Sequence, residues 1–506
     1  MTYAANDTER DTSCPSLFAP AEKNSRIEPA PSLRRRILFV TTEIADYVKV
    51  GGLGEVSAAL PRALAADFDV RVLIPGYSQV LARHNSLTVV GELDATANMP
   101  ACRIARALTG DGLIVYIVLA PELYERDGSP YGDRTGADWP DNHIRFGRLC
   151  SAAAEIALGR ADASWCADLV HCNDWPSALT PAYMRWRGRT APSVLTVHNL
   201  AYQGLFPREA ISDIGVPENA FHMEGVEFYD QLSFMKAGLI FADHITTVSE
   251  NYAREITTQE FGCGLDGVLR RRAAEGRLTG IVNGIDDSWN PSSDPHLAAR
   301  FEAGDWASRR VNTRAVREAF GLGESKGPLF AVVSRLVQQK GVDLVIEAAD
   351  EIVAHGGQIV VIGQGEAAIE KALRGKFAKN PRDLGLHVGF EERLARRMFA
   401  GSDFLLMPSR FEPCGLSQMF AQRAGSLPIV HRTGGLADTV RDGVTGFQFR
   451  SLTLDGLLGG VRRAFAAFHA KPLLSRMRRN AMGESFSWKE SAGVYGSLYL
   501  RGIGNR

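Results

Sequence analysis

Short apolar runs alternate with stretches of helical periodicity along most of this chain of 506 residues. Most of the runs are apolar at successive positions, which is typical of strands covered on both faces of a sheet. The amphipathic stretches between them favour units in which a helix connects two parallel strands. The predicted strands read RILFVTTE, VRVLIP, LIVYIVLA, DLVHCN, SVLTVHN and HITTVS in the first half, and LFAVVSR, QIVVIG, LHVGF, FLLMPS and LPIVHR in the second. The pattern therefore predicts an α/β protein with parallel sheets.

A polar segment at residues 283–296, NGIDDSWNPSSDPH, separates the two halves of this pattern. Its Asn, Asp, Ser and Pro residues are typical of a connector. We therefore expect two doubly wound, Rossmann-like domains, the first over residues 34–280 and the second over residues 281–485. The stretch FSWKESAGVYGSLYL near the end predicts a final amphipathic helix, to which we assign residues 486–506.

Composition narrows the class of protein. The formal net charge is -1, so neither nucleic acid nor an anionic membrane is indicated as the main partner. The longest apolar runs fall far short of the roughly 20 residues that a membrane span needs. Residues 1–33 are polar and have no apolar segment, so we expect a disordered tail and not a secretory signal. The seven cysteines form no C-x-x-C pair, which argues against zinc or a disulfide framework and favours the cytoplasm.

A glycine-rich loop follows the first predicted strand, in the segment YVKVGGLGEVSAALPRAL. A strand, a glycine loop and a helix in this order are typical of a phosphate-binding turn. The segment is not a Walker A loop, and Ser57 stands where the dinucleotide fingerprint needs its third glycine, which disfavours an NAD dehydrogenase. KVGGLGEV resembles RTGGLADTV near the other end of the chain, so we expect one such loop in each domain. The candidate residues are Lys49 and Gly52 in the first loop and Thr433, Gly434 and Gly435 in the second.

Two basic residues follow the first strand of the second half. Arg335 ends the strand, and Lys340 precedes Gly341 and a predicted helix. An arginine fork and a lysine point charge near a helix N-terminus are suited to a diphosphate. The alternative is that both are solvated loop charges.

The segment SRFEPCGLSQ follows another buried strand. Its loop would direct Glu412 toward a ligand, where the carboxylate accepts hydrogen bonds from sugar hydroxyls. The backbone amides of Cys414, Gly415 and Leu416 are candidates for binding a phosphate at the start of the helix predicted from Gly415. The alternative is that Glu412 caps that helix. Cys414 is disfavoured as a nucleophile, since no neighbouring His or Asn marks a dyad.

Histidine and carboxamide or carboxylate residues end two strands of the first half. His198 and Asn199 end SVLTVHN, while Asp174 follows DLVHCN and precedes a helix predicted from Trp175. Strand ends at the carboxyl edge of a parallel sheet are where ligands bind. The alternatives are a structural histidine and an Asp174 that serves as an N-cap. These residues lack the spacing of metal ligands, so we expect no metal site.

Eight motifs stand in one order along the chain: KVGGLGEV, HCNDW, TVHNLAYQG, FMKAGLIFADHITTVSENYAREI, GIVNGID, SRLVQQKG, SRFEPCGLSQM and RTGGLADTV. Together they resemble the bacterial glycogen synthases and their relatives, the plant starch synthases, over nearly everything after the first 33 residues. The resemblance implies a GT-B fold, with two Rossmann-like domains and the active site in the cleft between them. It also implies retaining transfer of glucose from ADP-glucose to the non-reducing end of glycogen or another α-1,4-glucan, with no cofactor.

The resemblance assigns roles to the candidate residues. Arg335 and Lys340 would hold the donor diphosphate and stabilise the departing ADP, because negative charge grows there in the transition state. Glu412 would contact the transferred glucose, and His198 would line the pocket for that glucose. The remaining assignments place Lys49, Gly52, Cys414, Gly415, Leu416, Thr433, Gly434 and Gly435 on the donor, and Asp174 and Asn199 on the acceptor side.

Three positions depart from the usual pattern of the family. Pro176 stands where many relatives have histidine, and Val50 and Gly54 stand where many bacterial relatives have Thr and Ala. The acceptor preference is therefore open, and the residues indicate no oligomeric state. Competing hypotheses are a retaining transferase that uses UDP-glucose or makes a disaccharide, a glucan phosphorylase with pyridoxal phosphate, and a glucan-binding protein without activity.

Overall fold

The computed structural model describes residues 34–188 and 191–504, so the expected tail over residues 1–33 lies outside the described part. The first sheet has nine strands in the order β12-β11-β7-β6-β1-β2-β5-β4-β3. Their bounds are β1 Arg36–Val40, β2 Asp69–Pro75, β3 Thr88–Leu93, β4 Cys102–Leu108, β5 Ile114–Leu119, β6 Leu169–Asn173, β7 Ser193–Val197, β11 His244–Thr247 and β12 Leu278–Gly280. The elements of this sheet and its helices are called the first domain below.

The first sheet is parallel except at one edge. The strands from β12 to β5 pair in parallel, whereas β3 pairs antiparallel with β4, and β4 pairs antiparallel with β5. The expectation of parallel sheets is confirmed, and the antiparallel strands β3 and β4 at this edge are an addition that the sequence did not predict. An antiparallel edge strand on a parallel sheet leaves one face toward solvent, and β3 is accordingly half-exposed along its length.

The second sheet has six strands in the order β15-β14-β13-β16-β17-β18, and all of them are parallel. Successive residues of β13 enter different core clusters: Phe330 and Val332 pack on one side of the sheet, and Leu329 and Ala331 on the other. The strands are therefore apolar on both faces, as the sequence predicts. Their bounds are β13 Leu329–Val333, β14 Gln358–Gly363, β15 Leu384–Val388, β16 Phe404–Met407, β17 Leu427–His431 and β18 Phe447–Phe449.

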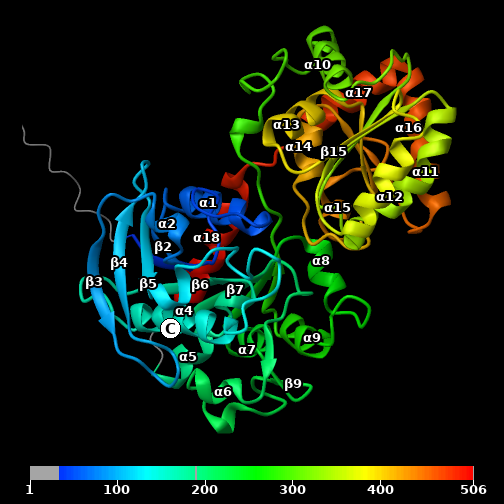
Figure 1. Cartoon of the computed structure of the whole chain (residues 1–506). Helices are drawn as coiled ribbons and strands as arrows, with labels where there is room; N and C mark the ends of the chain where they lie inside the picture. The colour runs from blue at the N-terminus through cyan, green and yellow to red at the C-terminus, as the bar shows by residue number, and fades with distance from the viewer. Residues whose placement is uncertain (1–33, 189–190, 505–506) are drawn as a thin grey trace, which may run out of the picture. The chain divides into compact units, whose positions relative to one another are not determined.

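Helices connect the strands of both sheets (Figure 1). Those of the first domain are α1 Gly52–Leu64, α2 Ser78–Leu81, α3 Pro121–Tyr124, α4 Asn142–Ala157, α5 Thr180–Trp186, α6 Ala210–Asp213, α7 Phe234–Phe241, α8 Glu250–Glu255 and α9 Asp266–Ala274. Those of the second domain are α10 Trp306–Ala319, α11 Val342–Ala354, α12 Ala367–Phe377, α13 Glu392–Gly401, α14 Ser417–Arg423, α15 Gly434–Thr439, α16 Leu454–His469 and α17 Lys471–Met482. A small antiparallel sheet of β8 Leu205–Pro207, β10 Gln231–Ser233 and β9 Glu227–Phe228 stands apart from both large sheets.

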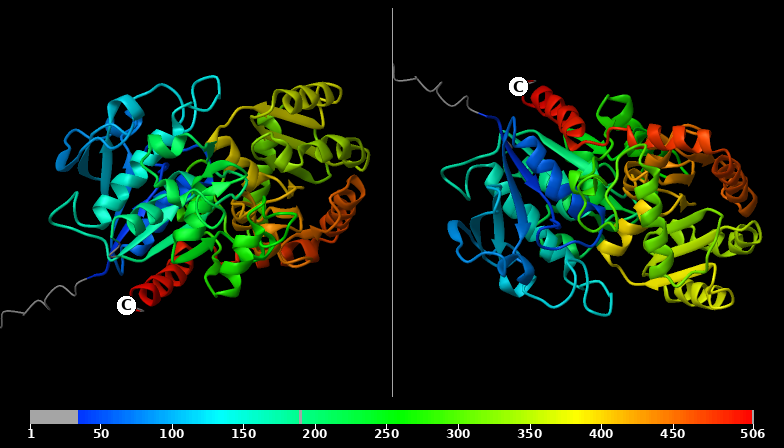
Figure 2. Two further views of the ribbon diagram at one scale, coloured as in Figure 1. Left: turned by 90° about the horizontal axis from the view of Figure 1, so that it is seen from below. Right: turned by 90° about the horizontal axis from the view of Figure 1, so that it is seen from above.

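The final helix, α18 Trp488–Gly504, follows the second domain in the chain but packs on the first. It contacts α1 and β6, and both views of Figure 2 show it, in red, beside the elements of the first domain. Its buried residues include Trp488, Tyr495 and Tyr499, which belong to the core of the first domain. The sequence correctly predicts an amphipathic helix here.

Two helix starts differ from the sequence prediction. The helix expected from Gly415 begins at Ser417, because Gly415 adopts a positive φ of 73° that no helix residue has. The helix expected from Trp175 is a single 3₁₀ turn over Trp175–Ser177. Across the described ranges, no helix is both long and apolar enough to span a bilayer.

Candidate active site

The candidate residues lie at the carboxyl ends of strands that flank the switch points of the two sheets. In the first sheet, β1 lies between β2 and β6, and Lys49 follows β1 while Asp174 follows β6. In the second sheet, β13 lies between β14 and β16, and Lys340 follows β13 while Glu412 follows β16. Ligands of open α/β sheets bind where strand order reverses in this way. The topology therefore places the predicted groups at the edges where binding is expected.

Lys340 and Glu412 form a partly buried ion pair in the second domain. The Lys340 Nζ lies 2.8 Å from Oε1 and 2.5 Å from Oε2 of Glu412, and Ser409 Oγ donates to Oε2 at 3.0 Å. The side chains are only 15% and 7% exposed. Neither is a freely solvated loop charge, and Glu412 caps no helix, since α14 has no side-chain cap.

The backbone around Lys340 is fixed by a glycine. Gly341 has a φ of 64° and is the N-cap of α11, and a Cβ there would lie 1.9 Å from the Pro408 carbonyl oxygen. Only glycine allows the two loops after β13 and β16 to approach this closely. That approach brings Lys340 to Glu412.

Arg335 is exposed, and one of its guanidinium nitrogens donates to the Gln339 side chain at 3.3 Å. Gln339 in turn donates to the Phe411 carbonyl at 3.1 Å, so it bridges the loops that carry Arg335 and Glu412. This bridging role of Gln339 was not predicted from the sequence. The exposed guanidinium is free to move toward an anion.

The backbone amides of Cys414, Gly415 and Leu416 donate no hydrogen bond to any partner among the described residues. They directly precede α14, so three unused donors stand at this loop. The Cys414 thiol is buried, and burial raises its pKa to about 12. A thiol that keeps its proton is a poor nucleophile, in agreement with the prediction.

The second glycine loop has its donors occupied. The Gly434 amide donates to both carboxylate oxygens of Glu255 at 2.9 and 3.0 Å, and the Thr433 hydroxyl donates to the same carboxylate at 3.2 Å. The Gly435 amide donates to the Glu412 carbonyl at 3.0 Å. Glu255 belongs to α8 of the first domain. It lies in the motif that ends in NYAREI, but nothing in that motif assigns Glu255 a role. A phosphate reaches Gly434 only if Glu255 leaves.

Lys49 is exposed in the first glycine loop, where its ammonium forms an ion pair with Glu55. The same ammonium lies 5.9 Å from the centre of the Phe390 ring, which follows β15 of the second domain and is 64% exposed. Gly52 begins α1 and is exposed. The loop thus presents one exposed cation, paired with Glu55, beside a residue of the other domain.

The strand ends of the first domain bring His198 and Asp174 together. His198 Nε2 lies 3.0 Å from the Asn173 side-chain oxygen, and burial lowers the pKa of His198 to about 3, so the ring is neutral at pH 7. Asn199 is half-buried, and its side-chain oxygen accepts the Ala201 amide at 3.1 Å.

Asp174 has an unusual environment. Its φ is 58°, in the left-handed region that a non-glycine residue rarely adopts, and its side chain caps no helix. Burial raises the pKa of Asp174 to about 8, against the opposing effect of the Asn199 and His198 amides. One of its carboxyl oxygens is buried with no hydrogen-bond partner among the described residues. Backbone strain and an unsatisfied oxygen are features of binding sites, not of a helix cap.

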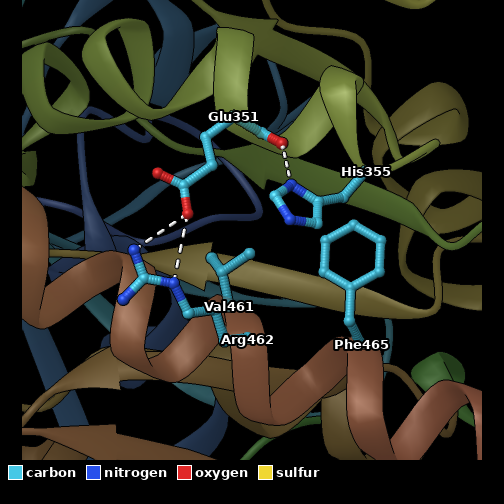
Figure 3. A pocket seen from close by; sticks show the side chains of 5 residues that line it. All are labelled: Glu351, His355, Val461, Arg462 and Phe465. Atoms are coloured by element: carbon cyan, nitrogen blue, oxygen red, sulfur yellow. Dashed lines mark hydrogen bonds and ion pairs between the residues drawn. The ribbon is translucent and has the colours of Figure 1, made fainter.

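A separate hollow of about 170 Å³ lies between α11 and α16 on the second domain (Figure 3). It is lined by Glu351, His355, Val461, Arg462 and Phe465. Arg462 Nη2 donates to Glu351 Oε1 at 2.9 Å, and His355 Nδ1 lies 2.8 Å from the Glu351 carbonyl oxygen. These groups satisfy one another and include none of the candidate residues, so we assign no role to the hollow.

No cluster of three or more His, Cys, Asp or Glu side chains able to hold a metal ion occurs within residues 34–188 and 191–504.

Two family models match the chain. The model described as starch synthase catalytic domain matches residues 36–271, and that described as glycosyl transferases group 1 matches residues 317–481. A protein named glycogen synthase 1 from Bradyrhizobium diazoefficiens is 58% identical over 456 residues, which cover 90% of this chain and 99% of that protein. The glycogen synthase of Pseudomonas aeruginosa is 55% identical over 494 residues, covering 98% of this chain and 95% of that protein.

Solved structures agree with these matches. The catalytic domain of starch synthase IV from Arabidopsis thaliana, bound to ADP and acarbose, gives a TM-score of 0.81 at 31% identity and covers 94% of this chain and 100% of its own. A sucrose-phosphate synthase from Thermosynechococcus elongatus gives a TM-score of 0.59 at 17% identity, over 94% of this chain and 100% of its own. The second similarity shows the fold alone.

Proposed function

The chain belongs to the family of bacterial glycogen synthases and plant starch synthases, and from this premise we propose how its residues perform the transfer of glucose. It is a glucosyltransferase with the GT-B fold. The donor we propose is ADP-glucose, and the acceptor is the non-reducing end of an α-1,4-glucan. The products are a glucan longer by one glucose, with the anomeric configuration retained, and ADP.

The observation that carries this proposal is the Lys340–Glu412 pair beside the unused amides of Cys414 to Leu416. A carboxylate that accepts sugar hydroxyls and a set of cationic and amide donors for a diphosphate stand within one short stretch of surface. This combination fits a sugar nucleotide, whose diphosphate and glucose are covalently linked. Lys340 and Arg335 would bind the diphosphate, and Glu412 would hold the glucose.

The leaving group is the centre of the proposed chemistry. The bond between the anomeric carbon and the phosphate oxygen breaks, the acceptor oxygen bonds to that carbon, and the acceptor's proton passes to the departing phosphate. Fixed positive charge at Lys340 and Arg335 stabilises the negative charge that grows on the phosphate. Neutral His198 would line the glucose pocket. Asp174 retains its proton up to a pH of about 8, so it would orient the acceptor by hydrogen bonding and not remove its proton.

We further propose that the donor binds mainly to residues 281–485 and the acceptor to residues 34–280, with Lys49 and Gly52 meeting the donor from the first domain when the domains close. Closure of this kind excludes water and limits hydrolysis of the donor. The bacterial relatives and the scattered cysteines support the cytoplasm as the place of the reaction.

The test is incorporation of radiolabelled glucose into glycogen from ADP-glucose, with UDP-glucose assayed in parallel. We expect incorporation from ADP-glucose that exceeds incorporation from UDP-glucose. Faster transfer from UDP-glucose would reject the proposed donor, and no incorporation from either donor by folded protein would reject the reaction.

A further inference from the structure

A buried carboxylate without an assigned role lies behind the first glycine loop. Glu43 follows β1 and is only 3% exposed. Its Oε2 accepts the Val50 amide at 2.7 Å and the Gly51 amide at 3.0 Å, and its Oε1 accepts the Tyr131 hydroxyl at 2.6 Å. All three donors are uncharged. A buried carboxylate is costly unless its environment compensates for lost water, so this arrangement needs a reason.

The two amides that Glu43 binds belong to the loop that carries Lys49. Lys49 directly precedes Val50, so the Glu43 carboxylate fixes the backbone on the C-terminal side of Lys49. On its N-terminal side, Ile44 and Val48 exchange two backbone hydrogen bonds of 3.1 and 2.9 Å. The loop between β1 and α1 is thus held at both ends, while the Lys49 side chain stays exposed.

Gly54 allows this arrangement to be compact. A Cβ at Gly54 would lie 3.4 Å from Glu43 Oε2 and 3.2 Å from the Lys49 Cγ. The carboxylate and the aliphatic stem of Lys49 therefore pack over the same glycine. The position of Lys49 therefore depends on Glu43 in two ways, through the backbone that Glu43 binds and through the contact of both side chains with Gly54.

Two amides of the first glycine loop are already occupied. Because the Val50 and Gly51 amides already donate to Glu43, neither is available to a phosphate. The resemblance of this loop to a phosphate-binding turn is therefore misleading for these two groups. What the loop offers to a donor is the Lys49 ammonium.

We propose that Glu43 is a positioning residue of the transferase, which acts by holding the loop so that Lys49 is presented to the donor diphosphate. This inference rests on the proposed function, in which Lys49 meets the donor. Glu43 itself contacts no substrate. Its contribution is to keep an exposed, flexible side chain within reach of its target before the donor arrives.

The test is a double-mutant cycle of Glu43→Ala and Lys49→Ala, read as kcat/KM for ADP-glucose and as affinity for ADP measured by calorimetry. If Glu43 acts through Lys49, Glu43→Ala lowers kcat/KM by about a hundredfold, as small misplacements of catalytic groups do. The double variant is then no more than about threefold worse than Lys49→Ala alone. Its ADP affinity likewise matches that of Lys49→Ala.

Glu43→Gln is the matched control for folding. Its side-chain oxygen still accepts the two amides while its nitrogen faces Tyr131, so we expect kcat/KM within about tenfold of wild type. Melting temperatures of the four variants, compared with that of wild type, report the structural cost separately. The proposal would be overturned if the losses in kcat/KM of the two single variants multiplied in the double variant. It would also be overturned if Glu43→Gln were as impaired as Glu43→Ala.

The ADP measurement separates this inference from the proposed function. A wild-type chain that binds ADP but transfers glucose from neither donor would refute the reaction, while the ADP affinities would still decide the role of Glu43. A folded wild-type chain that does not bind ADP at all would overturn both.

Discussion

At the scale of single residues, the Lys340–Glu412 pair combines a structural and a chemical role, and substitutions separate the two. Removing one member of a buried pair leaves the other charge without compensation. Because the side chains keep some exposure, we expect Lys340→Met or Glu412→Gln to lower the free energy of unfolding by about 1–3 kcal/mol.

The double variant distinguishes stability from catalysis. Lys340→Met together with Glu412→Gln buries no unpaired charge, so it should recover most of the lost stability. All three variants should lose at least about a hundredfold in kcat, because Lys340→Met removes a cation that stabilises the leaving phosphate and Glu412→Gln removes the carboxylate that holds the glucose. Urea unfolding and initial rates measure the two effects. A double variant with normal turnover would contradict the assigned roles.

Asp174 predicts a pH dependence of stability. Its pKa is about 8 in the folded chain, whereas an unfolded aspartate titrates at about 4. Between these values the folded chain binds a proton that the unfolded chain has lost, so the contribution of Asp174 to stability falls as pH rises through this window. Asp174→Asn does not titrate.

The measurement is the free energy of unfolding of wild type and Asp174→Asn between about pH 5 and pH 10. The stability of the variant relative to wild type should rise steadily with pH, and the difference should level off above the pKa of Asp174. Two curves that run parallel across this range would show that the carboxyl is not held protonated.

At the scale of elements, the approach of two loops in the second domain depends on Gly341. Alanine there would combine a positive φ with a Cβ that lies 1.9 Å from the Pro408 carbonyl oxygen. We expect Gly341→Ala to lower the free energy of unfolding by about 2 kcal/mol or more and to reduce kcat, because the backbone next to Lys340 must move.

Gly459 supplies the matched control. It lies inside α16, and a Cβ there would meet nothing within 4 Å. Gly459→Ala should therefore raise the free energy of unfolding by up to about 1 kcal/mol without changing kcat. Thermal unfolding and initial rates of Gly341→Ala and Gly459→Ala measure the two effects. Similar behaviour of both would mean that the contact at Pro408 does not constrain the loop.

The strands that the sequence predicts correctly are those whose residues are apolar on both faces, such as β1 and β13. The strands that it misses have a polar face. β4 reads CRIARAL and exposes Arg103, and β3 is exposed along much of its length, so neither forms an apolar run. β15 begins two residues before the predicted start, since Gly385 within it interrupts the apolar pattern.

The candidate residues themselves could be found because each stands at a strand end, which the pattern of runs already reveals. Their partners could not. Lys340 and Glu412 are 72 residues apart, and Glu255 and Gly434 are 179 residues apart. No local pattern indicates which distant strand ends meet, because strand order in the sheet decides it. Glu43 was missed for the same reason. It ends the predicted strand RILFVTTE, and its partner Tyr131 lies 88 residues away in the chain.

At the scale of the whole molecule, two elements of the chain link the first domain to the second. The first link is the segment formed by Ser249 and α8. The Ser249 hydroxyl donates to the Pro413 carbonyl at 2.6 Å, and the Asn251 backbone amide donates to the Asp438 carboxylate at 2.8 Å. The Glu255 carboxylate accepts the Gly434 amide in return. Each of the short helices α8 and α15 therefore offers a carboxylate to an amide near the start of the other. These contacts place the α8 segment against the loop that leads from Glu412 to α14.

The second link is α18, which returns the end of the chain to the core of the first domain. The Tyr499 hydroxyl lies 2.6 Å from His171 Nδ1, and both side chains are fully buried. Burial lowers the pKa of His171 to about 3, so the ring is neutral and depends on hydrogen bonds alone. Its other nitrogen lies 2.6 Å from the Thr196 hydroxyl.

Tyr499→Phe should therefore leave one nitrogen of His171 without a partner and lower the free energy of unfolding by about 1–3 kcal/mol. Tyr495→Phe is the control on the same helix, because the buried Tyr495 hydroxyl forms no hydrogen bond with any described residue, and its removal should cost little. Hydrogen exchange locates the effect: in Tyr499→Phe, the amides of β6 should exchange faster while those of β13 keep their protection. Equal losses in the two variants would mean that α18 is held by packing alone. Faster exchange throughout both sheets would mean instead that the last helix stabilises the two domains as one cooperative unit.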